Sequence, residues 1–368
     1  MKQREAIANI NIKRYTNPNY IEINLENYKK NIELSKKKSG SDIILIVKSD
    51  AYGHGLKSLS EYTYKECGIR HFGVATLDEA ISIRNILKDA VIFVLGYTDP
   101  LYLEDAISNN IILNVFDYNI ANLYNNYLTK IRKNINIILK IETGMNRLGF
   151  DPNLNIHNFI DKYKRLRIVH IMSHLASADS SIEYSNMQIS KFKDVVKNFK
   201  FNTSLFNSAG ICNLGNNQFS FTRPGIMTYG YVESNNNIPL KRVLSLYSKV
   251  IHVKNVKAGE MISYNGTYTA KKNIKIGILP IGYGDGLKRA LSNKGYVFIG
   301  GKKCDIIGRI CMNLAVVDVT NIPDNLLNEP VEIIGDNIDA NSMAKLCDTI
   351  PYEILTSFSK SIKKIYKR

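Results

Sequence analysis

The sequence predicts a (β/α)8 barrel followed by a mainly antiparallel β domain, and three observations support this prediction. Eight short apolar segments alternate with amphipathic helical segments up to about residue 240. Beyond that point the intervening helical segments disappear, and glycine-containing turns separate the apolar segments. Residue types found in active sites follow several of the first eight segments. A doubly wound open sheet is the alternative fold for the first part of the chain.

The eight candidate strands of the barrel are short and mostly apolar, as expected of strands that are buried on both faces. They span residues 43–47, 72–75, 91–95, 111–115, 135–141, 168–172, 204–206 and 219–221. Amphipathic segments that read as helices include residues 56–67, 78–87, 118–131 and 184–199, and a further helix is expected over 25–38, before Gly40. Thr76 and Glu79 have the spacing of a capping box, which marks the start of a helix.

The second domain is predicted to contain strands and one short helix. Its candidate strands are residues 243–253, 274–279, 296–299, 304–310, 314–319 and 331–334, and its helix spans 340–347. We therefore divide the chain into a barrel over residues 1–240 and a β domain over residues 241–368. The first residues could join the β domain, and an alternating piece at 7–12 could form an edge strand.

Composition excludes several classes of protein. No apolar segment is long enough to span a membrane, and the polar N-terminus lacks the apolar core of a signal peptide, so we expect a cytoplasmic protein with no membrane partner. The formal net charge is +16, but the basic residues are spread along the chain without a nucleic-acid motif. We therefore expect no nucleic-acid partner, although the positive field could attract an anionic small molecule.

The five cysteines are Cys67, Cys212, Cys304, Cys311 and Cys347. They are odd in number and widely spaced, and none forms a Cys-x-x-Cys pair. This pattern argues against a disulfide framework and against a zinc cluster, so we expect reduced thiols and no metal site.

Lys48 follows the first candidate strand directly and precedes a loop with Gly53 and Gly55. A lysine at the end of a strand can simply extend its amine into water, so its position alone does not decide its role. The other interpretation is functional, because partial burial lowers the pKa of an amine and allows it to form a Schiff base with a carbonyl cofactor.

Four further strand ends carry polar side chains that would meet Lys48 at the same end of a barrel. Arg147 follows the fifth strand and can bind a carboxylate through two hydrogen bonds, and His174 follows the sixth. Ser208 follows the seventh strand, and Arg223 with Gly225 follows the eighth. In (β/α)8 barrels the last two of these loops often bind phosphate, through small residues, hydroxyl groups and backbone N–H groups.

At this level of detail the chain resembles the alanine racemase family of fold-type III enzymes, which use pyridoxal 5'-phosphate (PLP). The resemblance extends nearly end to end and rests on motifs at residues 47–55, 140–149, 173–178, 207–209, 223–226, 262–268, 282–286, 308–312 and 351–353. It implies the same fold as the strand pattern, a barrel followed by a β domain.

The resemblance also implies a two-base mechanism. Lys48 would hold PLP covalently and act as the base on one face of the substrate, and Tyr264 would act on the opposite face. In the family this tyrosine comes from the β domain of the partner subunit, so a homodimer with shared active sites is expected. His174 and Arg223 would form the hydrogen-bonding chain that activates Tyr264, and Arg223 would face the pyridine nitrogen and keep it unprotonated.

Roles for the other residues follow from the same resemblance. Tyr52, Ser208, Gly225, Ile226 and Tyr352 would hold the phosphate of PLP. Arg147 and the backbone N–H of Met312 would bind the substrate carboxylate, Tyr283 would line the approach to the site, and Lys140 matches a lysine that is often carbamylated. The substrate would be alanine, and the D-alanine product would supply peptidoglycan synthesis.

One departure keeps the substrate open. The family usually has aspartate after the methionine of the 308–312 motif, whereas this chain has Asn313, as broad-specificity racemases of the same fold can. One alternative is therefore a racemase of the same fold that either has broad specificity or acts on serine or basic amino acids. An alternative from another class is a non-catalytic PLP-binding protein. Such binding proteins typically lack the β domain. The residue set of the related decarboxylases is not found.

Overall fold

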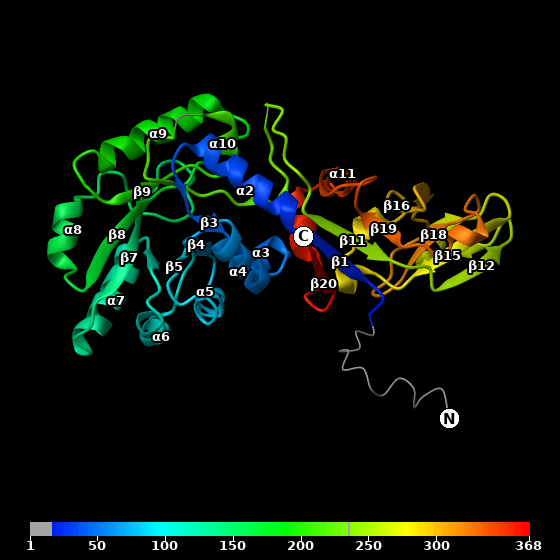
Figure 1. Ribbon diagram of the computed structural model, residues 1–368, viewed down its shortest axis with the longest axis horizontal. Helices are drawn as coiled ribbons and strands as arrows, with labels where there is room; N and C mark the ends of the chain where they lie inside the picture. The colour runs from blue at the N-terminus through cyan, green and yellow to red at the C-terminus, as the bar shows by residue number, and fades with distance from the viewer. Residues whose placement is uncertain (1–16, 216, 235) are drawn as a thin grey trace. The chain divides into compact units, whose positions relative to one another are not determined.

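The computed structural model describes residues 17–215, 217–234 and 236–368 (Figure 1). The described residues divide into two compact units: one contains residues 24–243 with 367–368, and the other contains residues 17–23 with 244–366. The alternating piece expected at residues 7–12 lies outside the described residues.

The larger unit contains a closed ring of parallel strands. They are β2 (Asp42–Ile43), β3 (Leu45–Ile46), β4 (His71–Val74), β5 (Val91–Val94), β6 (Leu113–Val115), β7 (Ile135–Lys140), β8 (Leu166–Met172), β9 (Asn202–Ser204) and β10 (Phe221–Thr222). Parallel pairing runs from β3 to β5 and from β6 to β10, and β10 pairs with β2. A bridge between Phe93 and Ile112 joins β5 to the segment before β6. Since β2 and β3 are two parts of the first expected strand, the ring has the eight strands that the sequence predicts.

Helices connect these strands in the order that the apolar periodicity predicts. They are α2 (Leu25–Ser39), α4 (Leu56–Glu66), α5 (Leu77–Arg84), α6 (Leu103–Ser108), α7 (Tyr118–Lys130), α8 (Ile156–Lys162), α9 (Ile182–Val196) and α10 (Ser208–Asn213). Figure 1 shows α7, α8 and α9 along the outer side of β7, β8 and β9. Asp117, Asn155 and Ser181 cap α7, α8 and α9 with side-chain oxygens that accept backbone N–H groups. The helix ends are thus set by local chemistry.

The capping box expected at Thr76 is only half formed. The Thr76 hydroxyl accepts from the N–H of Glu79 at 3.3 Å, as the motif requires. The Glu79 carboxylate does not return to Thr76. Its Oε2 accepts from the N–H of Ala75 at 3.0 Å, and its Oε1 accepts from the N–H of Asp50 at 3.3 Å. Glu79 is therefore used to hold the segment that follows Lys48.

The smaller unit is built mainly from antiparallel strands. One sheet has the order β17 (Lys302–Asp305), β16 (Tyr296–Ile299), β19 (Val331–Ile334), β11 (Leu244–Ser248), β1 (Tyr20–Asn24) and β20 (Lys363–Lys367). A second sheet contains β12 (His252–Val256), β15 (Ile274–Leu279) and β18 (Ala315–Asp318), and β13 (Met261–Ile262) pairs with β14 (Tyr268–Thr269). Two helices, α11 (Ala340–Leu346) and α12 (Pro351–Ser357), lie near the end of the chain. The single predicted strand over 243–253 is wrong, because the chain breaks there into β11 and β12, which belong to different sheets.

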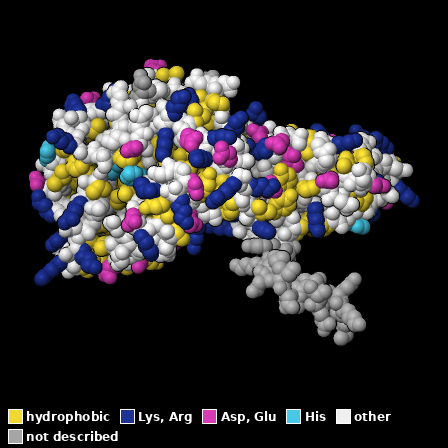
Figure 2. Space-filling model, in the orientation of Figure 1, with side chains coloured by type: hydrophobic (Ala, Val, Ile, Leu, Met, Phe, Trp, Pro, Cys, Tyr) yellow, Lys and Arg dark blue, Asp and Glu magenta, His cyan; other side chains and the backbone are white. Residues whose placement is uncertain are grey.

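The surface carries charges of both signs. On the face shown in Figure 2, Lys and Arg side chains are dispersed among Asp and Glu side chains and do not form a continuous stripe over the described residues. Among those residues no helix has both the length and the apolar character that a membrane-spanning helix requires.

The loop after the last barrel strand depends on one buried amide. Asn31 on α2 donates through Nδ2 to the carbonyl oxygens of Thr228 at 3.2 Å and Lys241 at 2.7 Å, and its Oδ1 accepts from the N–H of Lys241 at 2.9 Å. The side chain is 1% exposed. Asn31 thus ties α2 to two points of a segment about two hundred residues away.

We expect Asn31→Ala to lower the free energy of unfolding by about 2 kcal/mol, because the backbone groups it satisfies lose their partners. Chemical denaturation of the full chain measures this change. Asn158→Ala is the matched control, since Asn158 lies exposed on the barrel helix α8. Equal midpoints for both variants would contradict the role given to Asn31.

Candidate active site

Lys48 lies at the mouth of the barrel, directly after β3 and at the start of a turn with unusual backbone geometry. Ser49, Asp50, Ala51 and Tyr52 all have φ between 53° and 55°, in the left-handed region. This conformation costs side-chain-bearing residues roughly 1–2 kcal/mol each. Such strain persists only where the surrounding structure enforces it, and it is concentrated at functional sites.

Hydrogen bonds from neighbouring groups hold this left-handed turn in place. The N–H of Gly55 donates to the carbonyl oxygen of Asp50 at 2.8 Å, and Oδ1 of Asp50 accepts from the N–H of Leu56 at 2.8 Å. The carboxylate of Glu79 holds the N–H of Asp50. The turn keeps the lysine at the end of its strand and buries the ring of Tyr52.

The surroundings of Lys48 favour the neutral amine. Burial lowers the pKa of its amine, and the positive charges of Arg147 and Arg223 lower it further, against the opposing effect of Glu79. A neutral amine is the nucleophilic form that attacks a carbonyl group. The geometry therefore places a reactive amine among cations from two other strand ends.

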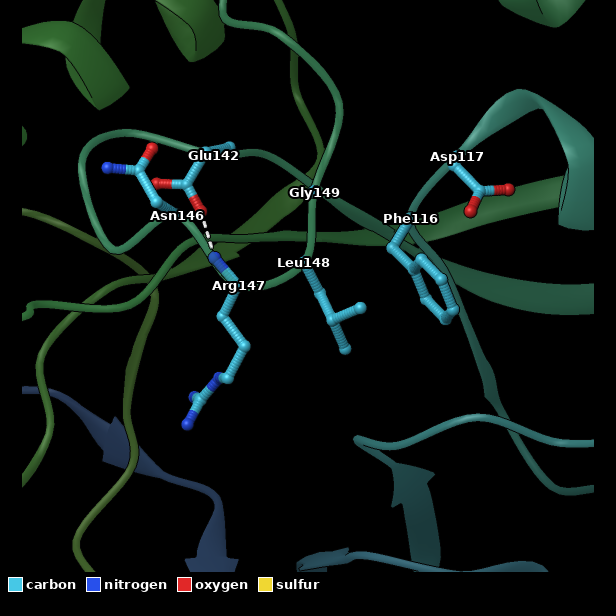
Figure 3. A pocket seen from close by; sticks show the side chains of 7 residues that line it. All are labelled: Phe116, Asp117, Glu142, Asn146, Arg147, Leu148 and Gly149. Atoms are coloured by element: carbon cyan, nitrogen blue, oxygen red, sulfur yellow. Dashed lines mark hydrogen bonds between the residues drawn. The ribbon is translucent and has the colours of Figure 1, made fainter.

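The loop that carries Arg147 is organised by Glu142. Its Oε1 accepts from the N–H of Met145 at 2.5 Å and from that of Gly144, and its Oε2 accepts from the N–H of Arg147 at 3.3 Å. Burial alone would raise the pKa of the Glu142 carboxyl, but the backbone donors outweigh it and hold the pKa below its ordinary value. Figure 3 shows the Arg147 side chain leaving the loop in a direction away from this carboxylate, so its guanidinium is available for another anion.

A cavity of about 260 Å³ adjoins this loop. It is lined by Phe116, Asp117, Glu142, Asn146, Arg147, Leu148 and Gly149 (Figure 3). The loop that carries Arg147 lines this cavity, whereas the other residues expected at the site do not. We assign no ligand to this cavity.

Arg223 and His174 form a buried hydrogen-bonded pair. Nη2 of Arg223 lies 3.1 Å from Nδ1 of His174, and it also donates to the carbonyl oxygens of Ser173 and Leu205. Burial and the charge of Arg223 lower the pKa of His174 well below its ordinary value. His174 is therefore neutral at physiological pH, and its Nδ1 accepts from the guanidinium.

Lys140 ends β7 close to the same cations. Burial, followed by the charges of Arg223 and Arg147, lowers the pKa of its amine well below the ordinary value, although Glu142 opposes them. The side chain is 8% exposed. Lys140 is thus a buried amine beside Arg147 and Arg223, and these surroundings favour its neutral form.

The loops after the seventh and eighth strands meet at Ser208. Its hydroxyl oxygen accepts from the N–H groups of Gly225 at 3.0 Å and Met227 at 3.3 Å, which leaves the hydroxyl proton for another acceptor. A Cβ on Gly225 would lie 2.5 Å from the hydroxyl oxygen of Tyr52, so only glycine fits there. Ile226 opens the short helix η2 (Ile226–Tyr229), where no intrahelical acceptor exists for its N–H.

The remaining expected site residues belong to the smaller unit, where Tyr352 lies on α12 and the others lie in loops or short turns. Tyr283 donates its N–H to the carbonyl oxygen of Cys311 at 3.1 Å, which joins its loop to the one that carries Met312. Ser263, beside Tyr264, donates its hydroxyl to the carbonyl oxygen of Arg309 at 2.5 Å. Tyr264, Tyr283, Met312 and Tyr352 are all exposed within this unit, and Tyr264 is 67% exposed.

The structure thus brings together two separate groups of expected site residues. Lys48, Tyr52, Arg147, His174, Ser208, Arg223, Gly225 and Ile226 lie in the larger unit, and Tyr264, Tyr283, Met312 and Tyr352 lie in the smaller one. Ser263 has a left-handed φ of 63°, as does Asn265 at 62°, so the backbone around Tyr264 is strained in the same way as that after Lys48.

Several supporting residues escaped the sequence analysis. Gln188 on α9 donates to the carbonyl oxygen of His174 at 3.0 Å and to Thr143 at 3.2 Å, and its Oε1 accepts from the N–H of Ala176 at 2.8 Å. Tyr184 on the same helix donates to the carbonyl oxygen of Gly144 at 2.6 Å. Polar residues on an amphipathic helix look like solvent-exposed positions, so their sequence carries no signal of this role.

We expect Glu142→Gln to lower the melting temperature at neutral pH, because the amide replaces a carboxylate that accepts three backbone N–H groups. Since the folded-state pKa of Glu142 is depressed, its stabilisation is present above the unfolded pKa and is lost as the pH falls through the folded pKa. The gap in melting temperature from the unaltered chain should therefore narrow in acid. Glu183→Gln, at an exposed position of α9, is the control. If the difference in melting temperature between Glu142→Gln and the unaltered chain did not change with pH, the negative charge of Glu142 would not be the cause of the stabilisation.

Comparison with known proteins gives a consistent result. Residues 23–233 match the model of the alanine racemase N-terminal domain, and residues 243–366 match that of the C-terminal domain. An alanine racemase of Borreliella burgdorferi is 35% identical over 358 residues, which cover 94% of this chain and 96% of that protein. The structure of an alanine racemase from Clostridium difficile 630 superposes with a TM-score of 0.88 at 31% identity, covering 96% and 97% of the two chains.

A third relative carries a cofactor. The structure of an alanine racemase from Bartonella henselae with covalently bound pyridoxal phosphate has a TM-score of 0.86 and 28% identity, and it covers 95% of this chain and 99% of that chain. These matches span both units and confirm the resemblance that the motifs indicate. This chain belongs to the alanine racemase family.

Proposed function

We propose that this chain is a PLP-dependent alanine racemase that interconverts L- and D-alanine by a two-base mechanism. The observation that carries the proposal is the environment of Lys48. Its amine has a lowered pKa, lies at the end of a barrel strand and is surrounded by Arg147 and Arg223. Membership of the alanine racemase family gives the reaction that such an amine serves.

The residues at the barrel mouth fit PLP in three respects. Lys48 offers an amine with a lowered pKa for the aldehyde carbon. Ser208 and the N–H of Ile226 offer donors for the phosphate, beside Tyr52 and Gly225. Among the described residues, Nε of Arg223 has no hydrogen-bond partner, so its N–H is available to a ligand atom. The family assigns Tyr352 to the phosphate as well.

Arg223 would control the protonation of the pyridine nitrogen of PLP. Burial lowers the pKa of its guanidinium to about 9, so it remains charged at neutral pH and acts only as a donor. Arg223 would hold the pyridine nitrogen of PLP by donating to it, which would leave that nitrogen unprotonated. When bound, PLP supplies the electron sink that makes the Cα–H of an amino acid acidic, and an unprotonated ring keeps this sink moderate.

Two side chains would move the proton. Nζ of Lys48 takes or returns a proton on one face of Cα, and the phenol oxygen of Tyr264 does so on the other. Tyr264 is exposed within its unit, as expected of a group that serves a second chain. We therefore propose a homodimer in which each active site combines Lys48 of one subunit with a tyrosine of the other.

Other residues would bind the substrate and select it. The guanidinium of Arg147 and the backbone N–H of Met312 bind the carboxylate, and Tyr283 lines the approach. Lys140 is buried and its lowered pKa favours the neutral amine, which is the form that reacts with carbon dioxide, so carbamylation there would place a negative charge beside Arg147. Asn313 donates to Oδ2 of Asp285 at 3.3 Å, in the loop that carries Tyr283. The enzyme would be cytoplasmic, and its product, D-alanine, would supply peptidoglycan synthesis.

We expect the purified chain with PLP to form D-alanine from L-alanine in a chiral assay, and Lys48→Ala to lose at least about a thousandfold in rate, because it removes both the covalent attachment and one base. Borohydride reduction followed by peptide mapping should place PLP on Lys48. Lys57→Ala, an exposed lysine on α4, is the control. Higher turnover of L-serine, L-lysine or L-arginine than of L-alanine would replace alanine as the substrate.

The shared-site arrangement predicts that two inactive variants restore activity together. Lys48→Ala and Tyr264→Phe chains, mixed and allowed to exchange subunits, should recover about a quarter of the unaltered activity, because half of the dimers are mixed and each has one intact site. The control is Lys48→Ala carried through the same exchange alone. No recovery despite verified exchange would place both bases in one chain.

A further inference from the structure

A chain of buried polar groups extends from Arg223 into the interior of the barrel. Nη1 of Arg223 donates to the hydroxyl oxygen of Ser204 at 2.5 Å, and this hydroxyl lies 2.7 Å from Nε2 of His170. Arg223 is 3% exposed, His170 1% and Ser204 0%. Neither Ser204 nor His170 belongs to the motifs that identify the family resemblance.

The strand register builds this chain. Ser204 ends β9 and is paired with Met172 on β8 and with Phe221 on β10, and Arg223 follows β10 directly. The N–H of Arg223 donates to the carbonyl oxygen of Phe206 at 2.8 Å, which fixes the start of its side chain. Ser204 therefore sits on a rigid strand beneath the guanidinium.

Aromatic rings hold the far end of the chain. The ring of His170 packs edge-on against Phe93 with a centroid separation of 5.5 Å, and it lies 5.9 Å from the ring of Phe221. Phe221 in turn packs against His71 at 4.8 Å. These rings come from β4, β5, β8 and β10, so His170 is locked in a layer of the barrel interior.

Within this hydrogen-bonded row of Arg223, Ser204 and His170, only the guanidinium is charged. Burial, then the charges of Arg223 and His71, lowers the pKa of His170 to about 3, so its imidazole is neutral. The acceptors of Arg223 are a hydroxyl, an imidazole nitrogen and two carbonyl oxygens. Within the described part of the chain no carboxylate binds this guanidinium. Its positive charge is therefore oriented by hydrogen bonds and is not neutralised.

We propose that Ser204 and His170 are positioning residues for Arg223: they fix the plane of its guanidinium so that Nε faces the cofactor while its charge stays uncompensated. The Ser204 hydroxyl accepts from Nη1 and donates its single proton to Nε2 of His170, so each member of the chain satisfies the next. Nη1 and Nη2 make the four contacts to protein groups, and Nε makes none among the described residues. This inference rests on the proposed function, because the role of Arg223 depends on bound PLP.

The uncompensated charge has a wide effect. Arg223 lowers the pKa values of Lys48, Lys140 and His174, so its placement influences the amine that holds the cofactor and the amine beside Arg147. If the guanidinium rotated away, the protonated form of the nitrogen at Lys48 would become more favourable. The pH at which the absorbance spectrum of bound PLP changes therefore reports the position of Arg223.

The test compares Ser204→Ala and His170→Phe with Ser220→Ala, which removes a hydroxyl from an exposed position beside Thr203 of β9. In the PLP-loaded enzyme we expect Ser204→Ala to lower kcat for alanine about tenfold and to change KM less than about twofold, because Arg147 still binds the carboxylate. The pH midpoint of the PLP spectrum should rise by about half a unit. His170→Phe should shift both quantities in the same direction, and His170→Gln should restore most of the unaltered behaviour.

Several outcomes would overturn the assignment. It is wrong if folded, PLP-loaded Ser204→Ala and His170→Phe match Ser220→Ala in both kcat and pH midpoint, since the pair would then serve only packing. If either variant fails to fold, nitrogen-15 NMR of the histidines in the unaltered enzyme tests the proposal instead. The imidazole of His170 is expected to stay neutral from pH 5 to 8. Titration of His170 within this range would contradict the proposal. A chain that binds PLP but forms no D-alanine would contradict the proposed function, while the spectral midpoint would still judge Ser204 and His170.

Discussion

The burial of one guanidinium constrains the rest of the barrel mouth. Arg223 sits where β10 ends, and its donors reach Ser173, His174, Ser204 and Leu205, which belong to the ends of β8 and β9 or directly follow them. Transferring a cation from water into a protein interior is costly unless hydrogen bonds replace its hydration. These loops must therefore present their oxygen and nitrogen acceptors to Arg223, and their shape follows from that need. The same charge then lowers the pKa values of the two lysines beside it.

Carboxylates outside the reacting centre hold the strained backbone segments. Glu79 binds the N–H of Asp50 in the left-handed turn after Lys48, and Glu142 binds three N–H groups in the loop of Arg147. Both carboxylates receive backbone donors that would otherwise be unsatisfied in tight turns. The positions of the amine and of the carboxylate-binding arginine thus depend on acidic residues that need no contact with a substrate. The charges of the two carboxylates also oppose the lowering of the lysine pKa values, Glu79 at Lys48 and Glu142 at Lys140.

Much of the fold was predictable because its signal is local and repeated. All eight barrel strands were expected within a few residues of their observed bounds, since buried parallel strands are short apolar runs and their helices show a clear 3.6-residue period. The errors arose where the pairing between strands decides where a strand begins and ends. The 243–253 segment was expected as one strand but divides between two sheets, and β9 and β10 are displaced toward 202–204 and 221–222. Hydrogen-bond partners, which no single segment encodes, set these limits.

The sequence by itself determined the family, the order of strands and helices, and the identity of the polar residues at the strand ends, because each depends on residue type and spacing along the chain. Only the tertiary structure decided that Glu79 turns to Asp50 instead of closing a capping box, that Gln188 supports the loops of His174 and Thr143, and that Ser204 and His170 lie beneath Arg223. Each of these contacts joins residues from different elements, up to 45 positions apart. Their geometry exists only once the barrel has closed, since closure brings neighbouring strands into register and turns alternate side chains toward one interior.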